Sequence, residues 1–250
     1  MSYLFSASGD LIDYTNISAL TDQTAITVAA WVYNTSGNTE EGRVYQKGPA
    51  HRLEWRNDLS TIVFLRTGTV NARAEAPYAN FASYAANKWL YVVTQYNWGG
   101  ASTDSRILMG DLSTLAAEPS SYTSQTAGSG TKTTNASNNF IVGNNAAAGA
   151  LEFNGRIAFI MAWNSLLTNK QIWSQQFGFY PVVTQNLQLF SHCGLNNVAG
   201  APDWSSNRNN GSITGATVAA HVPLPKRPNS RYLINIAAAS VDRSPARNQF

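Results

Sequence analysis

Ile26-Thr27-Val28-Ala29-Ala30-Trp31-Val32-Tyr33 is the stretch that decides the fold class of this chain. Its side chains alternate, with Ile26, Val28, Ala30 and Val32 on one face and Thr27, Ala29, Trp31 and Tyr33 on the other. β-Branched and aromatic residues in a period of two are typical of a strand in a packed sheet. The sequence therefore predicts a central strand over 26–33.

Two further segments carry a strand signal of similar strength. Trp89–Tyr96 is apolar or aromatic on both faces, as expected of a strand between packed sheets. Ile157–Trp163 is predicted to place Ile157, Phe159, Met161 and Trp163 on one face and Ala158, Ile160 and Ala162 on the other. Shorter strands are predicted over Leu4–Ser6, Leu11–Tyr14, Arg43–Gln46, Arg52–Trp55, Ile62–Arg66, Arg106–Gly110, Phe140–Gly143 and Leu187–Phe190. The run Glu118–Asn139 is too long for a hairpin loop, so we expect it to contain another strand.

One short helix is predicted over 169–177. Thr168 is its N-cap, Gln171 completes a capping box, and Gly178 provides a stop. Many short strands separated by Gly, Asn and Ser turns, with one brief helix, favour an all-β fold. We expect a two-sheet antiparallel jelly-roll sandwich, with one short helix and an extended C-terminal arm.

Three regions are expected along the chain. Residues 1–180 form the sandwich, and 181–221 form an additional strand and turn-rich segment packed on it. Residues 222–250 are predicted to be an extended arm, because Pro223, Pro225 and Pro228 interrupt regular structure.

Charge is concentrated in the arm. Residues 1–221 hold 12 Lys and Arg against 13 Asp and Glu, whereas the arm carries a net charge of +4. Such a tail is typical of a segment that binds an acidic partner, and a solubilising terminus is the alternative. The candidate partner-binding residues are Lys226, Arg227, Arg231, Tyr232, Arg243, Arg247 and Phe250. The arm lacks a regular alternation of aromatic and basic residues, which argues against nucleic acid as the main partner.

Cysteine content and the N-terminus suggest where the protein is made. The single Cys193 cannot form an internal disulfide. Residues 1–6 lack the basic and apolar regions of a signal peptide, and no apolar run approaches the length of a membrane span, about 18 residues. We therefore expect synthesis in the cytoplasm without a signal peptide, and no membrane span.

Catalytic constellations are not evident, so the chain is not expected to be an enzyme. Glycoside cleavage needs two cooperating carboxylates, and the nearest approach is Glu54 with Asp58. Arg56 lies between them, and a structural ion pair between Glu54 and Arg56 is the simpler interpretation. The three histidines lack zinc-ligand spacing, and neither a Gly-x-Ser-x-Gly elbow nor a phosphate-binding glycine loop is present.

The ordered series of motifs resembles the laminin G-like branch of the concanavalin A-like lectin/glucanase superfamily, over residues 3 to 180. The pieces that carry the resemblance are Leu4-Phe5-Ser6-Ala7-Ser8-Gly9-Asp10, Ala29-Ala30-Trp31-Val32-Tyr33, Lys88-Trp89-Leu90-Tyr91-Val92-Val93, Phe140-Ile141-Val142-Gly143-Asn144, Phe153-Asn154-Gly155-Arg156-Ile157-Ala158 and Leu166-Leu167-Thr168-Asn169-Lys170-Gln171-Ile172. Residues 203–211 are similar to an Asp-x-Ser-Gly-Asn-Gly-Asn-x-Gly turn seen beside such domains, with Ser206 and Arg208 where glycines are usual. Similar domains occur in bacteriophage structural proteins.

Two kinds of binding site are compatible with this resemblance. Laminin G-like domains often hold a calcium ion, and Asp203, Ser205, Asn207 and Asn209 alternate oxygen-bearing side chains that suit a hard cation. A side-chain-capped turn without an ion is the alternative, and no other cofactor is expected. Sugar binding needs an aromatic platform beside polar groups, which Asn97, Trp98 and Asp104 provide in one loop and Trp204 and Asn207 in another. The alternative is that both tryptophans pack against the edge of the sandwich.

The hypothesis that follows is a non-catalytic structural or decoration protein on the surface of a virus particle of the phage type. Its arm is expected to dock on other virion proteins or on copies of itself, and its rim to bind glycans. The alternative hypothesis is a free carbohydrate-binding module or lectin that acts at a cell surface.

Overall fold

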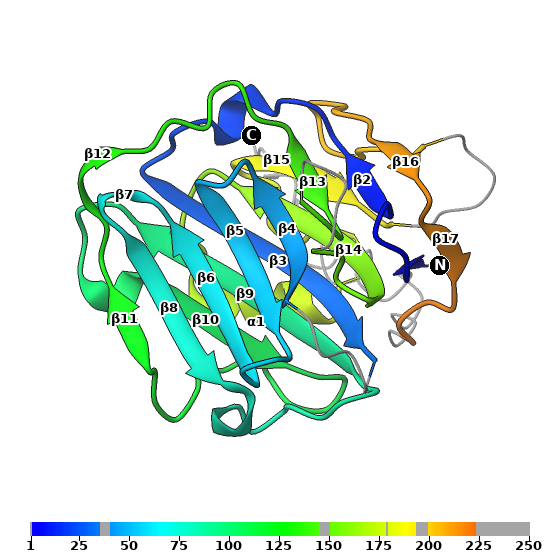
Figure 1. Cartoon of the computed structure of the whole chain (residues 1–250), viewed down its shortest axis with the longest axis horizontal. Coiled ribbons are helices and arrows are strands. Elements are labelled where there is room, and N and C mark those ends of the chain that lie inside the picture. Colours follow the sequence, from blue (N-terminus) through cyan, green and yellow to red (C-terminus); the bar gives the residue numbers. More distant parts are fainter. Residues whose placement is uncertain (1, 36–40, 146–150, 179, 194–199, 224–250) are drawn as a thin grey trace, which may run out of the picture.

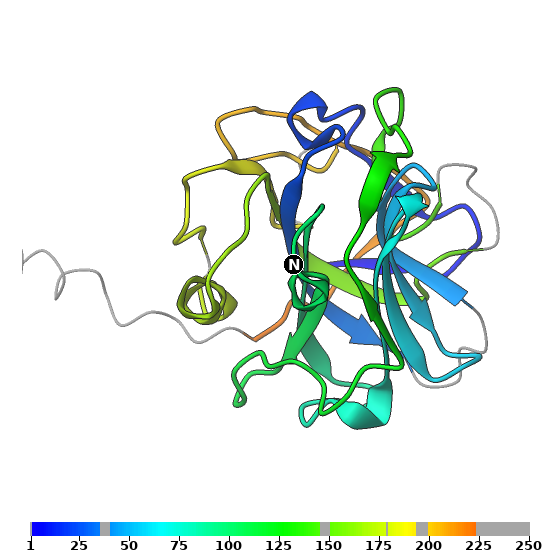
Figure 2. The ribbon, with the colours of Figure 1, turned by 90° about the vertical axis from the view of Figure 1, so that its left-hand side faces the viewer.

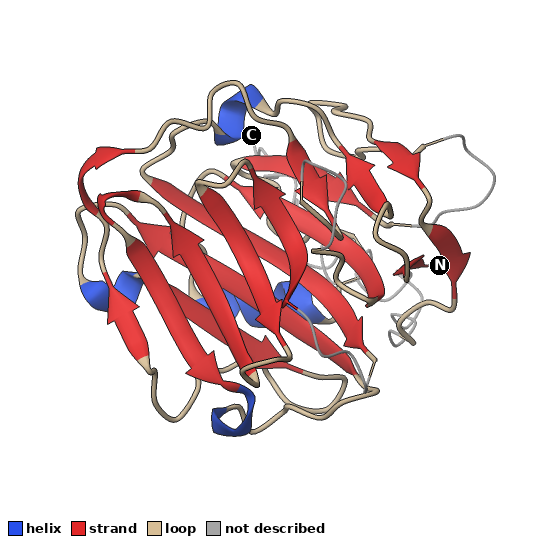
Figure 3. Ribbon diagram, in the orientation of Figure 1, coloured by secondary structure: helices blue, strands red, loops and turns tan. Residues whose placement is uncertain are grey.

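Two antiparallel β-sheets stacked face to face form the body of the molecule (Figure 1). This computed structural model describes residues 2–35, 41–145, 151–178, 180–193 and 200–223. Strands dominate the described chain, and its α-helix is short (Figure 3). The all-β, two-sheet prediction is confirmed.

The first sheet has seven strands in the order β10-β9-β3-β14-β1-β17, and β15 also pairs with β14. Its strands are β1 (Ser2–Phe5), β3 (Ala25–Asn34), β9 (Trp89–Asn97), β10 (Arg106–Gly110), β14 (Gly155–Trp163), β15 (Leu187–Ser191) and β17 (Thr217–Ala219). The predicted central strand is β3, which pairs with β9 on one side and β14 on the other.

The second sheet has eight strands in the order β11-β8-β6-β5-β4-β13-β2-β16. They are β2 (Leu11–Asp13), β4 (Glu41–Lys47), β5 (His51–Arg56), β6 (Thr61–Arg66), β8 (Ala72–Pro77), β11 (Ser124–Thr126), β13 (Phe140–Val142) and β16 (Ser212–Thr214). A small two-stranded sheet pairs β7 (Gly68–Val70) with β12 (Ser129–Lys132). Short 3-10 helices cover Ser18–Leu20, Tyr78–Asn80 and Ser102–Asp104.

The alternation predicted for β3 divides its side chains between two hydrophobic layers. Ile26, Val28, Ala30 and Val32 lie in the core between the sheets, whereas Ala29 and Trp31 belong to a second cluster on the outer face of the first sheet. Because each face meets its own hydrophobic layer, the first sheet is buried on both sides.

The faces predicted for the Ile157–Trp163 strand are partly wrong, because β14 contains a bulge. Ala158 pairs with Trp31 and Met161 with Ala29, so Phe159 and Ile160 together oppose one residue of β3. Phe159 takes a φ of 50° there. Ile157 therefore lies in the core between the sheets, and Ala158 lies with Phe159 in the outer cluster.

Helix α1 (Asn169–Gln176) covers the outer face of the first sheet, on the side away from the second sheet (Figure 2). Its predicted capping box is confirmed, since Thr168 Oγ1 accepts a hydrogen bond from Gln171 N at 3.3 Å. Trp31 Nε1 donates to Gln176 O at 3.2 Å, which ties the helix to β3. No helix in the described ranges has the length and apolar character of a membrane span.

The segment after the helix returns to both sheets. β15 pairs with β14, β16 with β2 and β17 with β1. Val222, which follows β17, is 2% exposed in the outer cluster. The arm residues predicted to bind a partner, Lys226, Arg227, Arg231, Tyr232, Arg243, Arg247 and Phe250, lie outside the described residues.

Candidate functional site

Trp98, the first predicted sugar platform, packs against the sandwich. Its Nε1 donates to Gly130 O at 3.0 Å, and its indole contacts the backbones of Gly68 and Gly128 so closely that a Cβ at either glycine would lie within 2.3 Å of a ring atom. The structure brings the predicted Asn97 and Asp104 together, with Asn97 Nδ2 3.1 Å from Asp104 Oδ2. This loop holds its tryptophan for packing and leaves little of the ring free to stack on a ligand.

Trp204, the second predicted platform, lies elsewhere, beside β15 on the outer side of the first sheet. Its backbone N donates to Phe190 O at 2.7 Å, which fixes the residue next to the strand. The side chain is 48% exposed. Trp204 is therefore anchored through its backbone while much of its ring faces solvent.

The predicted calcium ligands do come together, but their hydrogen bonds do not fit a cation. Asp203 is fully buried, and its carboxylate accepts from the backbone N of Phe190, Ser205 and Asn209 at 2.8–2.9 Å and from Ser205 Oγ at 2.8 Å. Asn207 and Asn209 turn their amide NH₂ groups toward Gln188 O. Both carboxylate oxygens thus face N–H and O–H donors, where calcium would require facing oxygen ligands. Within the described ranges no group of three His, Cys, Asp or Glu residues could hold a metal ion.

The capped turn positions Trp204. Asp203 links β15 to the backbone of 205–209, and Asn207 Nδ2 also donates to Gln188 Oε1 at 2.9 Å. Arg208, which stands where the similar turns have glycine, takes the left-handed φ of 54°. Side-chain hydrogen bonds hold the described turn together.

A pocket of about 390 Å³ opens beside Trp204. It is lined by Tyr180, Pro181, Thr184, Leu187, Phe190, Trp204, Ser205 and Ser206. Among these residues the sequence predicted only Trp204 as a sugar contact. Tyr180 was missed, although a Tyr-Pro pair just after a helix stop places an aromatic ring in an exposed turn, and that was the available signal.

His192 lies behind the pocket. Its ring centroid is 4.6 Å from Phe190, 5.6 Å from Tyr180 and 6.4 Å from Trp204. Burial, together with the nearby His221, lowers the pKa of His192 to about 4. The imidazole is therefore neutral at pH 7, and it adds no charge to the pocket.

The carboxylates considered for catalysis are held in ion pairs on the second sheet. Glu54 is 5% exposed and pairs with Arg43 and with Arg52, whose Nε lies 2.5 Å from Glu54 Oε1. Burial alone would raise the pKa of Glu54, but the charges and hydrogen bonds of both guanidinium groups outweigh it and lower the pKa. Glu54 is thus an ionised structural group, unsuited to act as a general acid.

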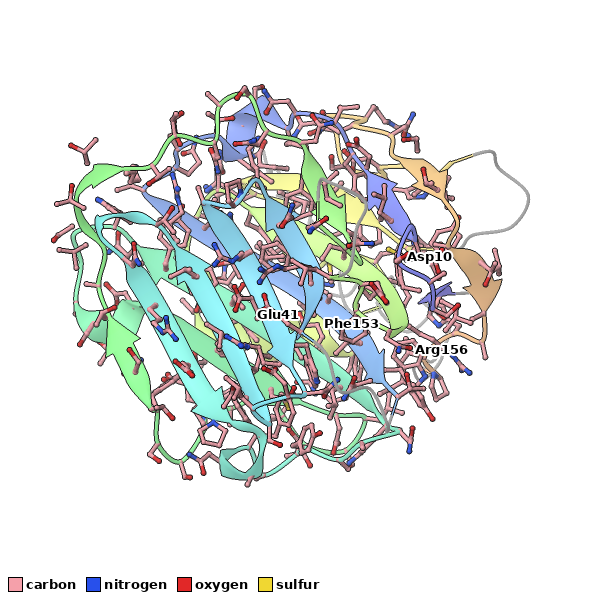
Figure 4. The ribbon with its side chains drawn as sticks, in the orientation of Figure 1. Asp10, Glu41, Phe153 and Arg156 are labelled. Atoms are coloured by element: carbon pink, nitrogen blue, oxygen red, sulfur yellow. The ribbon has the colours of Figure 1, made fainter. Side chains whose placement is uncertain are left out.

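The predicted pair between Glu54 and Arg56 is wrong. Arg56 Nη2 instead lies 3.1 Å from Asp58 Oδ2, and its Nε lies 3.9 Å from Glu41. The register of β4 with β5 explains the exchange, because it sets Arg43 opposite Glu54 and Glu41 opposite Arg56. Glu41 lies on β4 toward the viewer in Figure 4.

Comparison with known proteins identifies the fold family. A laminin G model described as the concanavalin A-like lectin/glucanases superfamily matches residues 6–173. No curated protein matches the sequence.

Solved structures share the fold at low identity. A proposed carbohydrate-binding protein from Bacteroides ovatus is similar at 16% identity and a TM-score of 0.62, over 90% of this chain and 61% of that one. Tailspike protein 2 of an Escherichia coli O157:H7 bacteriophage matches at 13% identity and a TM-score of 0.52, over 77% of this chain and 28% of that one. A heptameric pentraxin from Limulus polyphemus matches at 11% identity and a TM-score of 0.51, over 90% of this chain and 97% of that one. With the sequence match spanning most of the sandwich, the chain belongs to the concanavalin A-like lectin/glucanase superfamily.

Proposed function

We propose that the protein is a non-catalytic component of a virus particle of the phage type, and that it binds glycans at the pocket beside Trp204. The observation that carries the glycan-binding part is the pairing of two solvent-facing rings, Tyr180 and Trp204, at the mouth of one pocket. Sugars present an apolar face ringed by hydroxyls, so an exposed aromatic ring with hydroxyl groups beside it suits them.

The carboxylates support a binding role over a hydrolytic one. Glu54 forms ion pairs with two arginines, and the carboxylate of the buried Asp203 accepts several hydrogen bonds. Neither is free to donate a proton to a glycosidic oxygen or to attack a sugar carbon.

The placement on a particle rests on the sequence. The arm carries a net charge of +4 beyond a body of charge −1, which suits attachment to an acidic neighbour. The resemblance of the sandwich to domains of bacteriophage structural proteins supports the same location, at the particle surface. A free carbohydrate-binding module is the second candidate, favoured by the fact that the described residues lining the pocket all lie between 180 and 206, within the packed body.

Glycan binding is tested by a glycan array with the full chain and with Trp204→Ala. We expect binding to the full chain and at least about a tenfold loss in the variant, because aromatic stacking supplies much of the contact. Leu59→Ala is the matched control, since Leu59 is 55% exposed in the turn between β5 and β6 of the other sheet. Equal binding by Trp204→Ala and Leu59→Ala would contradict this location of the site.

A further inference from the structure

The chemistry of the pocket beside Trp204 narrows the sugar it can take, on the assumption that the proposed glycan binding is correct. We infer that it selects a neutral terminal sugar with a methyl group at one edge, either the C6 methyl of a 6-deoxyhexose or the methyl of an N-acetyl group. Both sugars share one requirement, which is an apolar group that enters the base of the pocket.

The residues that line the pocket indicate that the sugar it binds is uncharged. None of the eight described lining residues carries a charge. The carboxylate of the buried Asp203 accepts a hydrogen bond from the backbone N of the lining residue Ser205, so an acidic group lies beside the pocket and no basic one lines it. An acidic sugar would need a cation in the site, and the described lining offers none.

The base of the pocket is apolar and offers no free amide. Leu187 and Phe190 are 8% and 2% exposed. Their backbone N–H groups are already used, since Leu187 N donates to Thr184 O at 3.3 Å and Phe190 N donates to Asp203 Oδ1 at 2.9 Å. A sugar hydroxyl placed against these side chains would lose its hydrogen bonds to water, whereas a methyl group would not.

Polar groups lie at the mouth instead. Thr184 and Ser206 are exposed, and no hydrogen bond joins either side-chain hydroxyl to another described residue. They can therefore exchange hydrogen bonds with the ring hydroxyls of a sugar that stacks on Trp204 and Tyr180. A volume of about 390 Å³ is near the lower end for small-molecule sites, which suits a single terminal sugar.

Matched sugars test this inference by calorimetric titration of the full chain. The pairs are methyl L-fucoside against methyl L-galactoside, which differ by a hydroxyl at C6, and methyl N-acetylglucosaminide against methyl N-formylglucosaminide, which differ by the methyl group alone. We expect the methyl-bearing member of at least one pair to bind about tenfold or more tightly than its partner, and the pair that discriminates identifies which methyl is read. Methyl glucuronide should bind more weakly than methyl glucoside.

Variants separate the inference from the proposed function. Trp204→Ala should abolish binding of the preferred sugar, and the smaller change Leu187→Ala should reduce the ratio within the discriminating pair. If both pairs bind equally, or if glucuronide binds best, and Trp204→Ala still abolishes binding, the selectivity is wrong and the pocket remains a glycan site. If no sugar binds, or if Trp204→Ala changes nothing, the proposed glycan site fails as well.

Discussion

His51 is a titratable residue placed in the core between the sheets, 1% exposed. The rings of Tyr45, Phe64 and Tyr96 surround it, with centroids 5.4–5.7 Å from its own. Burial, followed by the positive charges of Arg66 and Lys47, lowers its pKa to about 3. The folded protein therefore holds His51 neutral over a pH range in which the unfolded chain would protonate it.

This difference makes the free energy of unfolding depend on pH. A histidine whose folded pKa is lowered contributes its full stability above about pH 6.5, and the contribution falls as the pH drops toward the folded pKa. We expect His51 to reduce the free energy of unfolding by about 1.4 kcal/mol for each pH unit below that value. Urea denaturation at pH 7, 6 and 5 should show a shallower dependence for His51→Phe than for the natural chain. Other titrating groups, including His192, are common to both proteins. If the free energy of unfolding fell equally with pH in both, His51 would be excluded as a source of the pH dependence.

At the scale of elements, α1 depends on its N-terminal cap. Thr168 and Gln171 exchange hydrogen bonds, since Gln171 N donates to Thr168 Oγ1 at 3.3 Å and Gln171 Oε1 accepts from Thr168 N at 2.8 Å. Replacing Thr168 by alanine removes the hydroxyl that accepts the hydrogen bond of Gln171 N and should lower the free energy of unfolding by about 1 kcal/mol. Thermal and urea denaturation measure the change. Thr168→Ser keeps the hydroxyl and should be near neutral, as should Lys170→Ala in the same turn, and an equal loss in all three would argue against the cap.

The same helix illustrates what a sequence can predict. Caps and apolar alternation are local, so α1, β3 and β9 were predicted within a residue or two of their observed bounds. β8 was missed because its inward side chains are Ala72, Ala74 and Ala76, which give little apolar contrast. The polar β11 and β12 were recognised only as a run that should contain a strand. The bulge in β14 was not predictable, because Phe159 at a positive φ has no local signature.

In the candidate site, too, the local sequence predicted only some of the residues that come together. Trp98 and Trp204 have comparable neighbours in sequence, each preceded by Asn or Asp and followed by small residues. Tertiary packing distinguishes them, because Gly68 and Gly128 approach the ring of Trp98 whereas Trp204 remains about half exposed. Tyr180 joins Trp204 only because β15 pairs with β14 and brings both segments to one face of the sheet.

At the scale of the whole molecule, the described chain beyond the helix adds strands to both sheets. β17 extends the first sheet at β1, and His221 places its ring 4.6 Å from that of Phe159 in the bulge of β14. Val222, the next residue, packs in the outer hydrophobic cluster. Val222 thus lies within the predicted arm but belongs to the packed cluster, so a truncation after residue 223 should retain every described strand.

Deleting residues 224–250 tests whether attachment and folding are separate properties of the chain. We expect the shortened protein to melt within a few degrees of the full chain, because Val222 and β17 remain, and to lose incorporation into the proposed particle. Circular dichroism measures the first outcome and co-purification with particles the second.

Two arm variants separate the contributions of charge and of aromatic contact to attachment. Lys226→Gln with Arg227→Gln and Arg231→Gln removes three positive charges, and Tyr232→Ala with Phe250→Ala removes two rings. If charge steers the attachment, the first variant should incorporate less at low salt and depend less on salt than the natural chain, since screening weakens attraction between exposed charges and the variant has fewer of them. Normal incorporation of the shortened chain would contradict the role of the arm, whereas absence of the full chain from particles would favour the free carbohydrate-binding module.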